Sequence, residues 1–453
     1  MAFDRSELFA RMPVRKAVLR QILPAVASQM ITLIYNLADT YFVGLLNDPN
    51  QTAAVTVATS SFVMLTAISN LFGVGGASCL AGALGKRQPE RAKEIAALSF
   101  WGGIVCALLF SGVMLVLARP ILELGGATAD TYELAFGYAK WAVIIGGPFT
   151  VLNVLLANLV RAEGSANLAS FGVSFGGVLN ILLDPLFVMP QFLNMGAAGA
   201  GLATAISNLA ATAFFLIYIL RRREHTVLRI GVGYLRRWKA HLRPVLAVGL
   251  PSALQMTLTV AAVSAHMNFV SRYSTEAVAA LGIVKKLDQL PLFVSIGIAN
   301  GLLPLLAFNH AAGDHRRRSQ AFRFGVTLSV AFSVLCLAVY ELLAPQLVSL
   351  FIEDQRTVDY AAVFLRQMVT AMPMVAIGYP MIVQFQAMGK VRQALISSVL
   401  RKGLLDLPLL FLMDRLLPLY GCMWVQPMVD AIALVVVLVF YAQIRRKELT
   451  HFD

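Results

Sequence analysis

Polar side chains form stripes along several otherwise apolar segments of this chain. Within a segment they recur every three or four residues, a spacing that places them on one face of a helix. They include two carboxylates, Asp39 and Asp184, and no basic residue shares either face. Buried carboxylates without a basic partner must be neutralised by a proton or a metal cation. The stripes comprise Gln29, Thr32, Asn36, Asp39, Asn153, Gly177, Asn180, Asp184, Thr204 and Asn208.

The composition places these stripes inside a membrane. Of the 453 residues, 58% are hydrophobic and only 13% are charged, and the mean hydropathy is +0.73. A soluble domain carries about 25% charged residues. A membrane helix needs about 20 apolar residues, and this rule predicts an all-α integral membrane protein with twelve transmembrane helices. Their ranges are 17–46, 54–84, 94–118, 132–160, 166–190, 197–220, 244–271, 278–311, 321–344, 358–388, 393–414 and 420–444.

The distribution of basic residues predicts the orientation of these helices. When the loops are assigned alternately to two sides, one side receives 27 of the 37 basic residues and the other side four. Basic loops stay on the cytoplasmic side. We therefore expect both termini to be cytoplasmic and the protein to lie in the plasma (inner) membrane. The net charge of +13 then reflects topology, and no nucleic-acid partner is expected.

Two halves of the sequence resemble each other. Pro24–Met30 matches Pro251–Met256, and glycines recur at corresponding loops with an offset of 225 to 228 residues. Such parallel repeats predict two pseudo-twofold-related six-helix lobes around a central cleft. We expect an N-terminal lobe at 1–220, a basic cytoplasmic linker at 221–243 and a C-terminal lobe at 244–453, in a protein that is a monomer.

The second half does not repeat the acidic stripe. His266 stands where the first half has Asp39, and it is interpreted as either a packing residue or a proton relay. Charged residues occur instead in the eighth, eleventh and twelfth segments, where structural pairing, snorkelling and function all remain open. They are Lys285, Lys286, Asp288, Arg401, Lys402, Asp406 and Asp430.

Four sequence stretches make the chain similar to the multidrug and toxic compound extrusion family, and within it to the DinF-like branch. They are "PAVASQMITLIYNLADTYFVG" from Pro24, "RAEGSANLA" from Arg161, "NILLDP" from Asn180 and "GAAGAGLATAISN" from Gly196. The resemblance implies an antiporter that exports drug-like small molecules, often cationic or amphipathic, by alternating access. It implies a coupling ion, H⁺ or Na⁺, and no cofactor. Residues matching the family's cation site, including any Na⁺ site, are Asp39, Asn180, Asp184 and Thr204.

The substrate is expected to bind in the cleft between the lobes. The residues that we predict to line it are polar, aromatic or soft side chains on the helices that should border the cleft. They are Gln29, Tyr35, Asn36, Asn153, Asn208, Met256 and His266.

Two alternative functions would require other sequence features. A lipid-linked oligosaccharide flippase of the same superfamily would present a cationic cavity for pyrophosphate, whereas the first half is acidic. A membrane-embedded enzyme would need a metal-binding motif such as Asp-x-x-Asp or His-Glu-x-x-His, and neither occurs in the sequence. We therefore expect a transporter and not an enzyme.

The predicted topology is testable by cysteine labelling. A cysteine introduced in the 47–53 loop should react with a membrane-impermeant thiol reagent added to intact cells, and one in the 221–243 linker should not. The wild-type protein controls for the four native cysteines. Labelling of the linker but not of the 47–53 loop would reverse the orientation.

Overall fold

The computed structural model describes residues 6–449, and every regular element in that range is a helix. This agrees with the predicted all-α class. Residues 1–5 and 450–453 lie outside the described residues. The predicted cytoplasmic location of the two termini therefore concerns residues that are partly outside this range.

Each predicted span corresponds to one helix or to a broken pair of helices. After the short α1 (Ser6–Ala10), the first half contains α2 (Val14–Gly44), α3 (Pro49–Gly85), α4 (Pro89–Leu124), α5 (Tyr132–Ala139) continued by α6 (Gly147–Ala162), α7 (Ala166–Val188) and α8 (Gly196–Arg221). The second half contains α9 (Trp238–Val270), α10 (Thr275–Ala311), α11 (His315–Ser349), α12 (Gln355–Val369) continued by α13 (Met372–Ala387), α14 (Val391–Val399) continued by α15 (Asp406–Leu416), and α16 (Tyr420–Leu449). The prediction of twelve spans is confirmed.

Three of the spans are broken into separate helices. The fourth bends by 51° between α5 and α6, where the π-helical segment η1 (Lys140–Ile145) precedes Gly146, and the tenth bends by 44° between α12 and α13. The eleventh span, predicted over 393–414, is also broken. It is interrupted by η3 (Leu400–Leu404), in which Lys402 and Gly403 leave the helical conformation. Gly403 has φ +135°, a conformation that residues with a Cβ rarely adopt.

The linker between the halves is shorter than predicted and is fixed to the first half. Because α9 begins at Trp238, part of the predicted 221–243 linker is helical. The Glu163 carboxylate accepts hydrogen bonds from Thr226 Oγ1 (2.7 Å) and the Val227 amide (2.8 Å). Trp101 Nε1 donates to the Ile230 carbonyl at 2.9 Å. These contacts fix the connecting chain against α4 and the end of α6.

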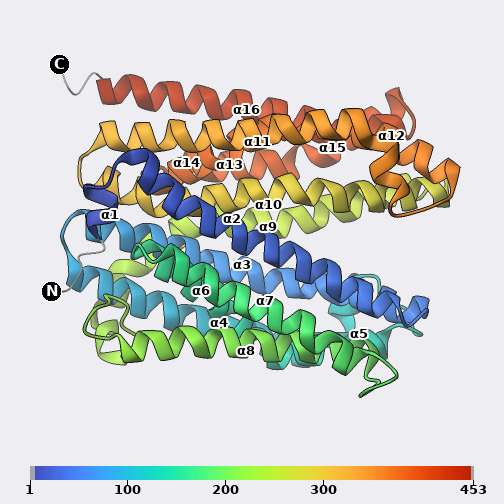
Figure 1. Ribbon diagram of the computed structural model, residues 1–453, viewed down its shortest axis with the longest axis horizontal. Coiled ribbons are helices and arrows are strands. Elements are labelled where there is room, and N and C mark those ends of the chain that lie inside the picture. The colour runs from blue at the N-terminus through green and yellow to red at the C-terminus, as the bar shows by residue number, and fades with distance from the viewer. Residues whose placement is uncertain (1–5, 450–453) are drawn as a thin grey trace.

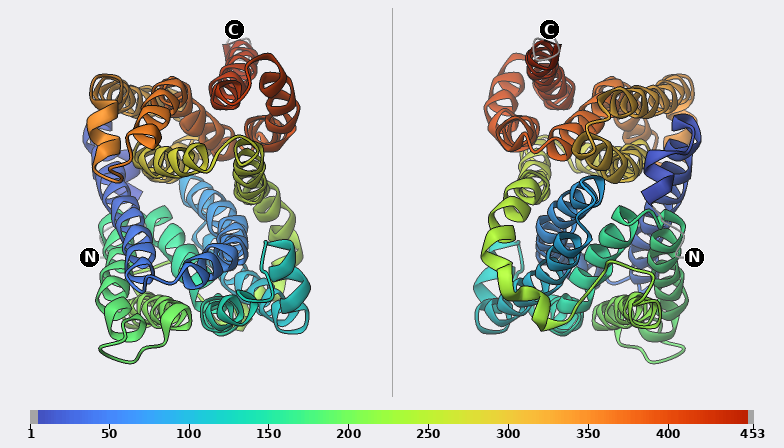
Figure 2. Two further views of the ribbon diagram at one scale, coloured as in Figure 1. Left: turned by 90° about the vertical axis from the view of Figure 1, so that its right-hand side faces the viewer. Right: turned by 90° about the vertical axis from the view of Figure 1, so that its left-hand side faces the viewer.

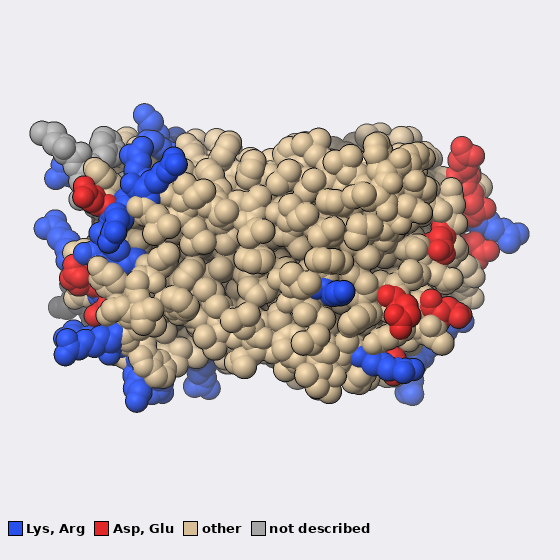
Figure 3. Space-filling view, turned by 90° about the horizontal axis from the view of Figure 1, so that it is seen from below, with Lys and Arg blue, Asp and Glu red and all other residues tan. Residues whose placement is uncertain are grey.

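The helices form two lobes that lie side by side, with their long axes roughly parallel (Figures 1 and 2). We call α2–α8 the N-lobe and α9–α16 the C-lobe. Basic side chains gather at one end of the molecule, a wide belt with very few charged side chains follows, and acidic side chains are frequent at the other end (Figure 3). The "basic end" carries the loops 86–88, 163–165, 222–237, 312–314 and 388–390. This arrangement is typical of a multi-pass membrane protein.

The apolar cores show where the lobes meet. The largest core lies at the basic end and includes residues of both lobes, among them Ile22 and Phe72 of the N-lobe and Leu302 of the C-lobe. Toward the opposite end, a second core is confined to the C-lobe, around Phe364. A third is confined to the N-lobe, around Leu65. The lobes therefore share one core at the basic end and have separate cores at the other end.

Glycines bring the two lobes into backbone contact at the basic end. A Cβ added to Gly249 of α9 would lie 1.9 Å from the Leu71 carbonyl oxygen of α3, and one added to Gly75 would lie 2.1 Å from the Val245 oxygen. On the other side of the interface, Gly301 of α10 packs against the backbone of Ile22 in α2. Only glycine permits such an approach of two helices.

Substitution of Gly249 tests whether this contact holds the basic end closed. We expect Gly249→Leu to separate the lobes there, because overpacking costs about 1–3 kcal/mol and the opposing atoms are backbone. Spin labels at the exposed positions Lys86 and Arg316 should report longer distances in this variant.

Gly112→Leu is the matched control, since a Cβ at Gly112 meets nothing within 4 Å. An identical distance distribution in Gly249→Leu and Gly112→Leu would show that the glycine contact does not govern closure.

Candidate functional site

The structure brings together the four residues predicted to form the cation site. Asp39 lies on α2, Asn180 and Asp184 on α7, and Thr204 on α8. Asn180 Nδ2 donates to Thr204 Oγ1 at 3.4 Å, and the carboxylates of Asp39 and Asp184 are close enough to interact electrostatically. The sequence spacing predicted only which residues share a face of one helix. The fold brings the polar faces of α2, α7 and α8 together.

Gly177 allows α7 to approach α2 at this point. A Cβ on Gly177 would lie 2.8 Å from Ile31 Cγ2 and 3.1 Å from Tyr35 Cδ1. The glycine occurs one turn before Asn180 on the same helical face. It therefore sets the separation between the helix that carries Asp39 and the helix that carries Asp184.

The site contains buried oxygen atoms without hydrogen-bond partners. Asp184 is 0% exposed, and neither of its carboxylate oxygens has a partner; the same holds for Asp39 Oδ1 and Asn180 Oδ1. Among the described residues, no basic side chain forms an ion pair with either carboxylate. A buried, unpaired carboxylate is unfavourable by several kcal/mol. This set of oxygens is suited to holding a proton between carboxylates or to coordinating a hard cation such as Na⁺.

Sequence reasoning missed Tyr138, which belongs to the site. This side chain is 3% exposed, and its hydroxyl lies near Asp39, Asp184 and Thr204. Tyr138 is carried by α5, directly before the π-helical segment η1. Segments of this type are frequent at functional sites because they redirect neighbouring side chains. A phenolic hydroxyl in an apolar segment was the available signal.

Two predicted amides extend the site toward α6. Asn153 Nδ2 donates to Asn208 Oδ1 at 2.9 Å, and Asn208 Nδ2 donates to the Thr204 carbonyl at 2.9 Å. Thr204 therefore connects the amide pair to the oxygens around Asp184. Asn153 Oδ1 is buried and has no partner, so a polar ligand atom has an acceptor there.

Of the other residues predicted to line the substrate cleft, some lie on α2 near this site and some lie in the other lobe. Tyr35 is next to Asp39, whereas Asn36 is exposed and Gln29 half-buried on α2. Met256 and His266 lie on α9 in the other lobe, and His266 Nε2 is 3.0 Å from the Cys422 carbonyl oxygen. The assignment of these five residues to a substrate cleft stays a prediction.

A family model described as MatE matches residues 24–186 and, a second time, residues 251–412. The chain belongs to the MatE family. It is 30% identical over 435 residues to "Multidrug export protein MepA" of Staphylococcus aureus (strain MSSA476), with 96% of this chain and 95% of that protein covered. This relative is named as an export protein rather than as an enzyme. The double match also agrees with the internal repeat that the sequence predicted.

Solved structures of MATE transporters share the fold. One is titled the outward-facing conformation of a multidrug resistance MATE family transporter of the MOP superfamily (TM-score 0.90, 24% identity, 99% of this chain and 98% of that chain). Another is a MATE protein in complex with MaL6 (TM-score 0.91, 23% identity, 99% of both chains). This similarity confirms the predicted arrangement of transmembrane helices in two lobes. Membership of the DinF-like branch stays a prediction.

Proposed function

We propose that this protein exports drug-like small molecules, often cationic or amphipathic, from the cytoplasm in exchange for entering H⁺ or Na⁺. The observation that carries the proposal is the pair Asp39 and Asp184, whose carboxylates have buried oxygens and, among the described residues, no ion pair with a basic side chain. The name of the staphylococcal relative supports export of several drugs. The protein acts as a monomer in the plasma (inner) membrane, with the basic end and both termini in the cytoplasm.

The coupling ion binds where the carboxylates are uncompensated. Desolvation and mutual repulsion make it unfavourable for both carboxylates to stay charged in a dry lobe. One proton relieves both effects. Sodium would need several oxygens, and Asn180 Oδ1 and Thr204 Oγ1 lie beside the two carboxylates to supply them. Tyr138 adds a phenolic hydroxyl within electrostatic reach of both carboxylates.

The positions of the cores support alternating access. The lobes share a core at the basic end and separate toward the other end, so a rotation of one lobe against the other opens one end as it closes the other. The lobe interface at the basic end combines this shared apolar core with close helix contacts through Gly75, Gly249 and Gly301. We infer that the present arrangement is the one closed toward the cytoplasm.

Exchange follows from competition between the two ligands for the same lobe. A cationic substrate is favoured while Asp39 and Asp184 are free, and H⁺ or Na⁺ binding to them disfavours the substrate-bound arrangement. Because linkage is reciprocal, the substrate must weaken cation binding by the same factor. The acidic character of the N-lobe site favours a cationic substrate over the pyrophosphate of a lipid-linked oligosaccharide.

Cation binding should be visible as stability of the purified protein. A cation at one hundred times its Kd stabilises the folded state by about 2.7 kcal/mol, so the wild-type Tm should rise with H⁺ or with Na⁺. Asp184→Asn should be stable without the cation and should lose most of this rise, because no uncompensated charge remains to be neutralised. The measurement is thermal unfolding at varied pH in sodium or choline buffer.

Asp359→Asn is the matched control for this experiment, since Asp359 is an exposed carboxylate on α12. It should keep the wild-type cation dependence. If Asp184→Asn also keeps it in full, the cation binds elsewhere.

Transport itself is tested in everted vesicles. With an imposed H⁺ or Na⁺ gradient, wild-type protein should accumulate a cationic dye, and the gradient that drives uptake identifies the coupling ion. Asp39→Asn and Asp184→Asn should each reduce driven uptake about tenfold or more, since a coupling loss of only 1.4 kcal/mol gives a factor of ten.

Each transport variant must reach the membrane in wild-type amounts, as judged by immunoblotting, and Asp359→Asn should transport normally. Normal driven uptake by both N-lobe variants would contradict the proposed site.

A further inference from the structure

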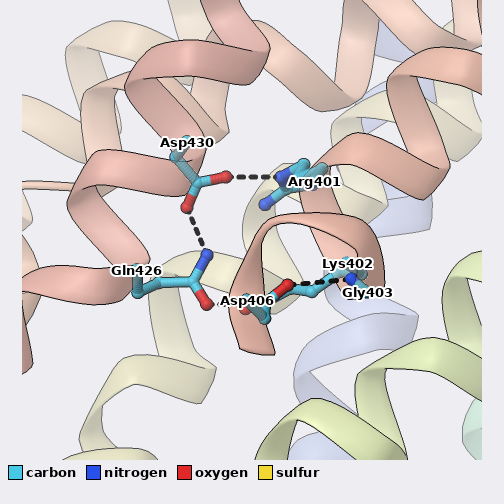
Figure 4. Close-up of polar contacts among 6 residues, drawn as sticks. All are labelled: Arg401, Lys402, Gly403, Asp406, Gln426 and Asp430. Atoms are coloured by element: carbon cyan, nitrogen blue, oxygen red, sulfur yellow. Dashed lines mark hydrogen bonds and ion pairs between the residues drawn. The ribbon is translucent and has the colours of Figure 1, made fainter. Parts of the chain in front are cut away.

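The broken eleventh span carries a second group of buried polar residues, in the C-lobe. Arg401 Nε and Asp430 Oδ1 are 2.7 Å apart, and these residues are 3% and 2% exposed. Gln426 Nε2 donates to the second oxygen of Asp430 at 2.6 Å, while Lys402 Nζ donates to Gln426 Oε1 at 2.6 Å. The Gly403 amide donates to Asp406 Oδ2 at 2.8 Å. Figure 4 shows these side chains converging from η3, α15 and α16.

This cluster lies where the repeat places Gly177, Asn180 and Thr204 in the N-lobe, whereas His266 and Leu410 stand at the positions equivalent to Asp39 and Asp184. A shift of 226 residues places Gly403 on Gly177, Asp406 on Asn180 and Asp430 on Thr204. The correspondence holds in space as well as in sequence. A Cβ on Gly403 would lie 2.9 Å from a methyl carbon of Leu258 in α9, as one on Gly177 would lie 2.8 Å from Ile31 in α2. Both glycines thus pack against the first helix of their lobe.

The two sites differ in where their positive charge comes from. The same shift replaces Phe175 by Arg401 and Gly176 by Lys402, so the C-lobe site contains two basic side chains that the N-lobe site lacks. Lys402 lies within electrostatic reach of Asp288, Asp406 and Asp430. Together with Lys285, the cluster holds three basic residues and three carboxylates.

The charged and titratable groups that face this cluster come from every helix around it. They are His266 on α9, Lys285 and Asp288 on α10, Tyr340 on α11, Tyr379 on α13, Arg401 and Lys402 in η3, Asp406 on α15 and Asp430 on α16. With Lys285, Arg401 and Lys402 charged, the three carboxylates are balanced without an external ion.

We propose that the C-lobe contains a second monovalent-cation site, formed where Asp406 and Asp430 replace Asn180 and Thr204, in which the ammonium group of Lys402 takes the place of the external cation. The proposal rests on the proposed cation site of the N-lobe. Asp406 Oδ1 is buried and has no hydrogen-bond partner, and the same is true of Asn180 Oδ1 at the equivalent position of the N-lobe. If the Lys402 ammonium group were removed, Asp406 Oδ1 could therefore bind a proton or a metal cation in its place. The C-lobe is therefore permanently loaded, and only the N-lobe exchanges its cation.

The proposal is tested by removing the tethered charge in a protein whose N-lobe site is already disabled. In an Asp39→Asn/Asp184→Asn background, the further change Lys402→Met should create a requirement for one additional cation per chain. Equilibrium binding of ²²Na⁺ to the purified protein detects sodium. The infrared absorption of a protonated carboxyl group, followed over a pH titration, detects a proton.

Two further variants make the result specific. Adding Asp406→Asn to Lys402→Met restores the charge balance and should abolish the additional cation, and Lys402→Arg should never acquire it. If Lys402→Met does not fold, the Lys402→Met/Asp406→Asn combination should fold, because only the charge imbalance prevents folding. A folded Lys402→Met protein that binds neither ion, or a failure of Asp406→Asn to rescue an unfolded one, would overturn the proposal.

The N-lobe proposal is judged separately from this test. Its failure appears as unchanged cation binding when Asp39→Asn/Asp184→Asn is compared with the wild type. The C-lobe result is read only from the difference that Lys402→Met makes within that background.

Discussion

Charge neutrality inside an apolar lobe is the constraint on which the rest of this structure depends. A carboxylate in the membrane interior requires a partner, because the surrounding side chains and lipid do not solvate it. In the C-lobe the partners are basic side chains of the protein itself: Arg401, whose Nε lies 2.7 Å from Asp430 Oδ1, and the nearby Lys402. The N-lobe supplies none to Asp184, although this residue is fully buried. The two lobes have the same fold and opposite solutions to the same electrostatic problem.

The contacts between the lobes determine how a change at the carboxylates of one lobe affects the other lobe. At the basic end the lobes share an apolar core and approach each other closely through glycines. At the other end each lobe has a core of its own. A cation that changes the packing of α2 against α7 also changes α2 where it meets α10, because one helix takes part in both contacts. Through α2, the chemistry of the N-lobe reaches the interface.

Most of the fold was predictable from the sequence because lipid imposes strong local rules. The spans follow from runs of apolar residues, and their order follows from the alternation of basic loops. The grouping of Asp39 with Asn36 and of Asn180 with Asp184 follows from helical periodicity. The internal repeat predicted two lobes. These signals depend only on neighbours in the sequence.

The features that the sequence did not predict depend on contacts between distant segments. The break at Lys402 and Gly403 lies in a segment whose apolar content fits a continuous helix, and it is stabilised by bonds to Asp406 and to Gln426 of another helix. Tyr138 joins the candidate cation site from the fourth span, and its proximity to Asp39, Asp184 and Thr204 depends on how distant helices pack. The start of α9 at Trp238 lies in a polar stretch, where hydropathy has no power to locate a helix end.

The repeat explains how one lobe was able to change without loss of the fold. Glycine is required at 177 and 403 for close packing, and it is present at both positions, whereas the adjacent positions 175, 176, 401 and 402 are free to differ in charge. Lys402 donates to Gln426, which in turn donates to Asp430, and the Gly403 conformation accommodates the break in the helix at this point. The N-lobe, with Phe175 and Gly176, keeps an intact α7. Under the proposed function an external ion neutralises its carboxylates, and exchange of a cation and continuity of the helix are then linked alternatives at one structural position.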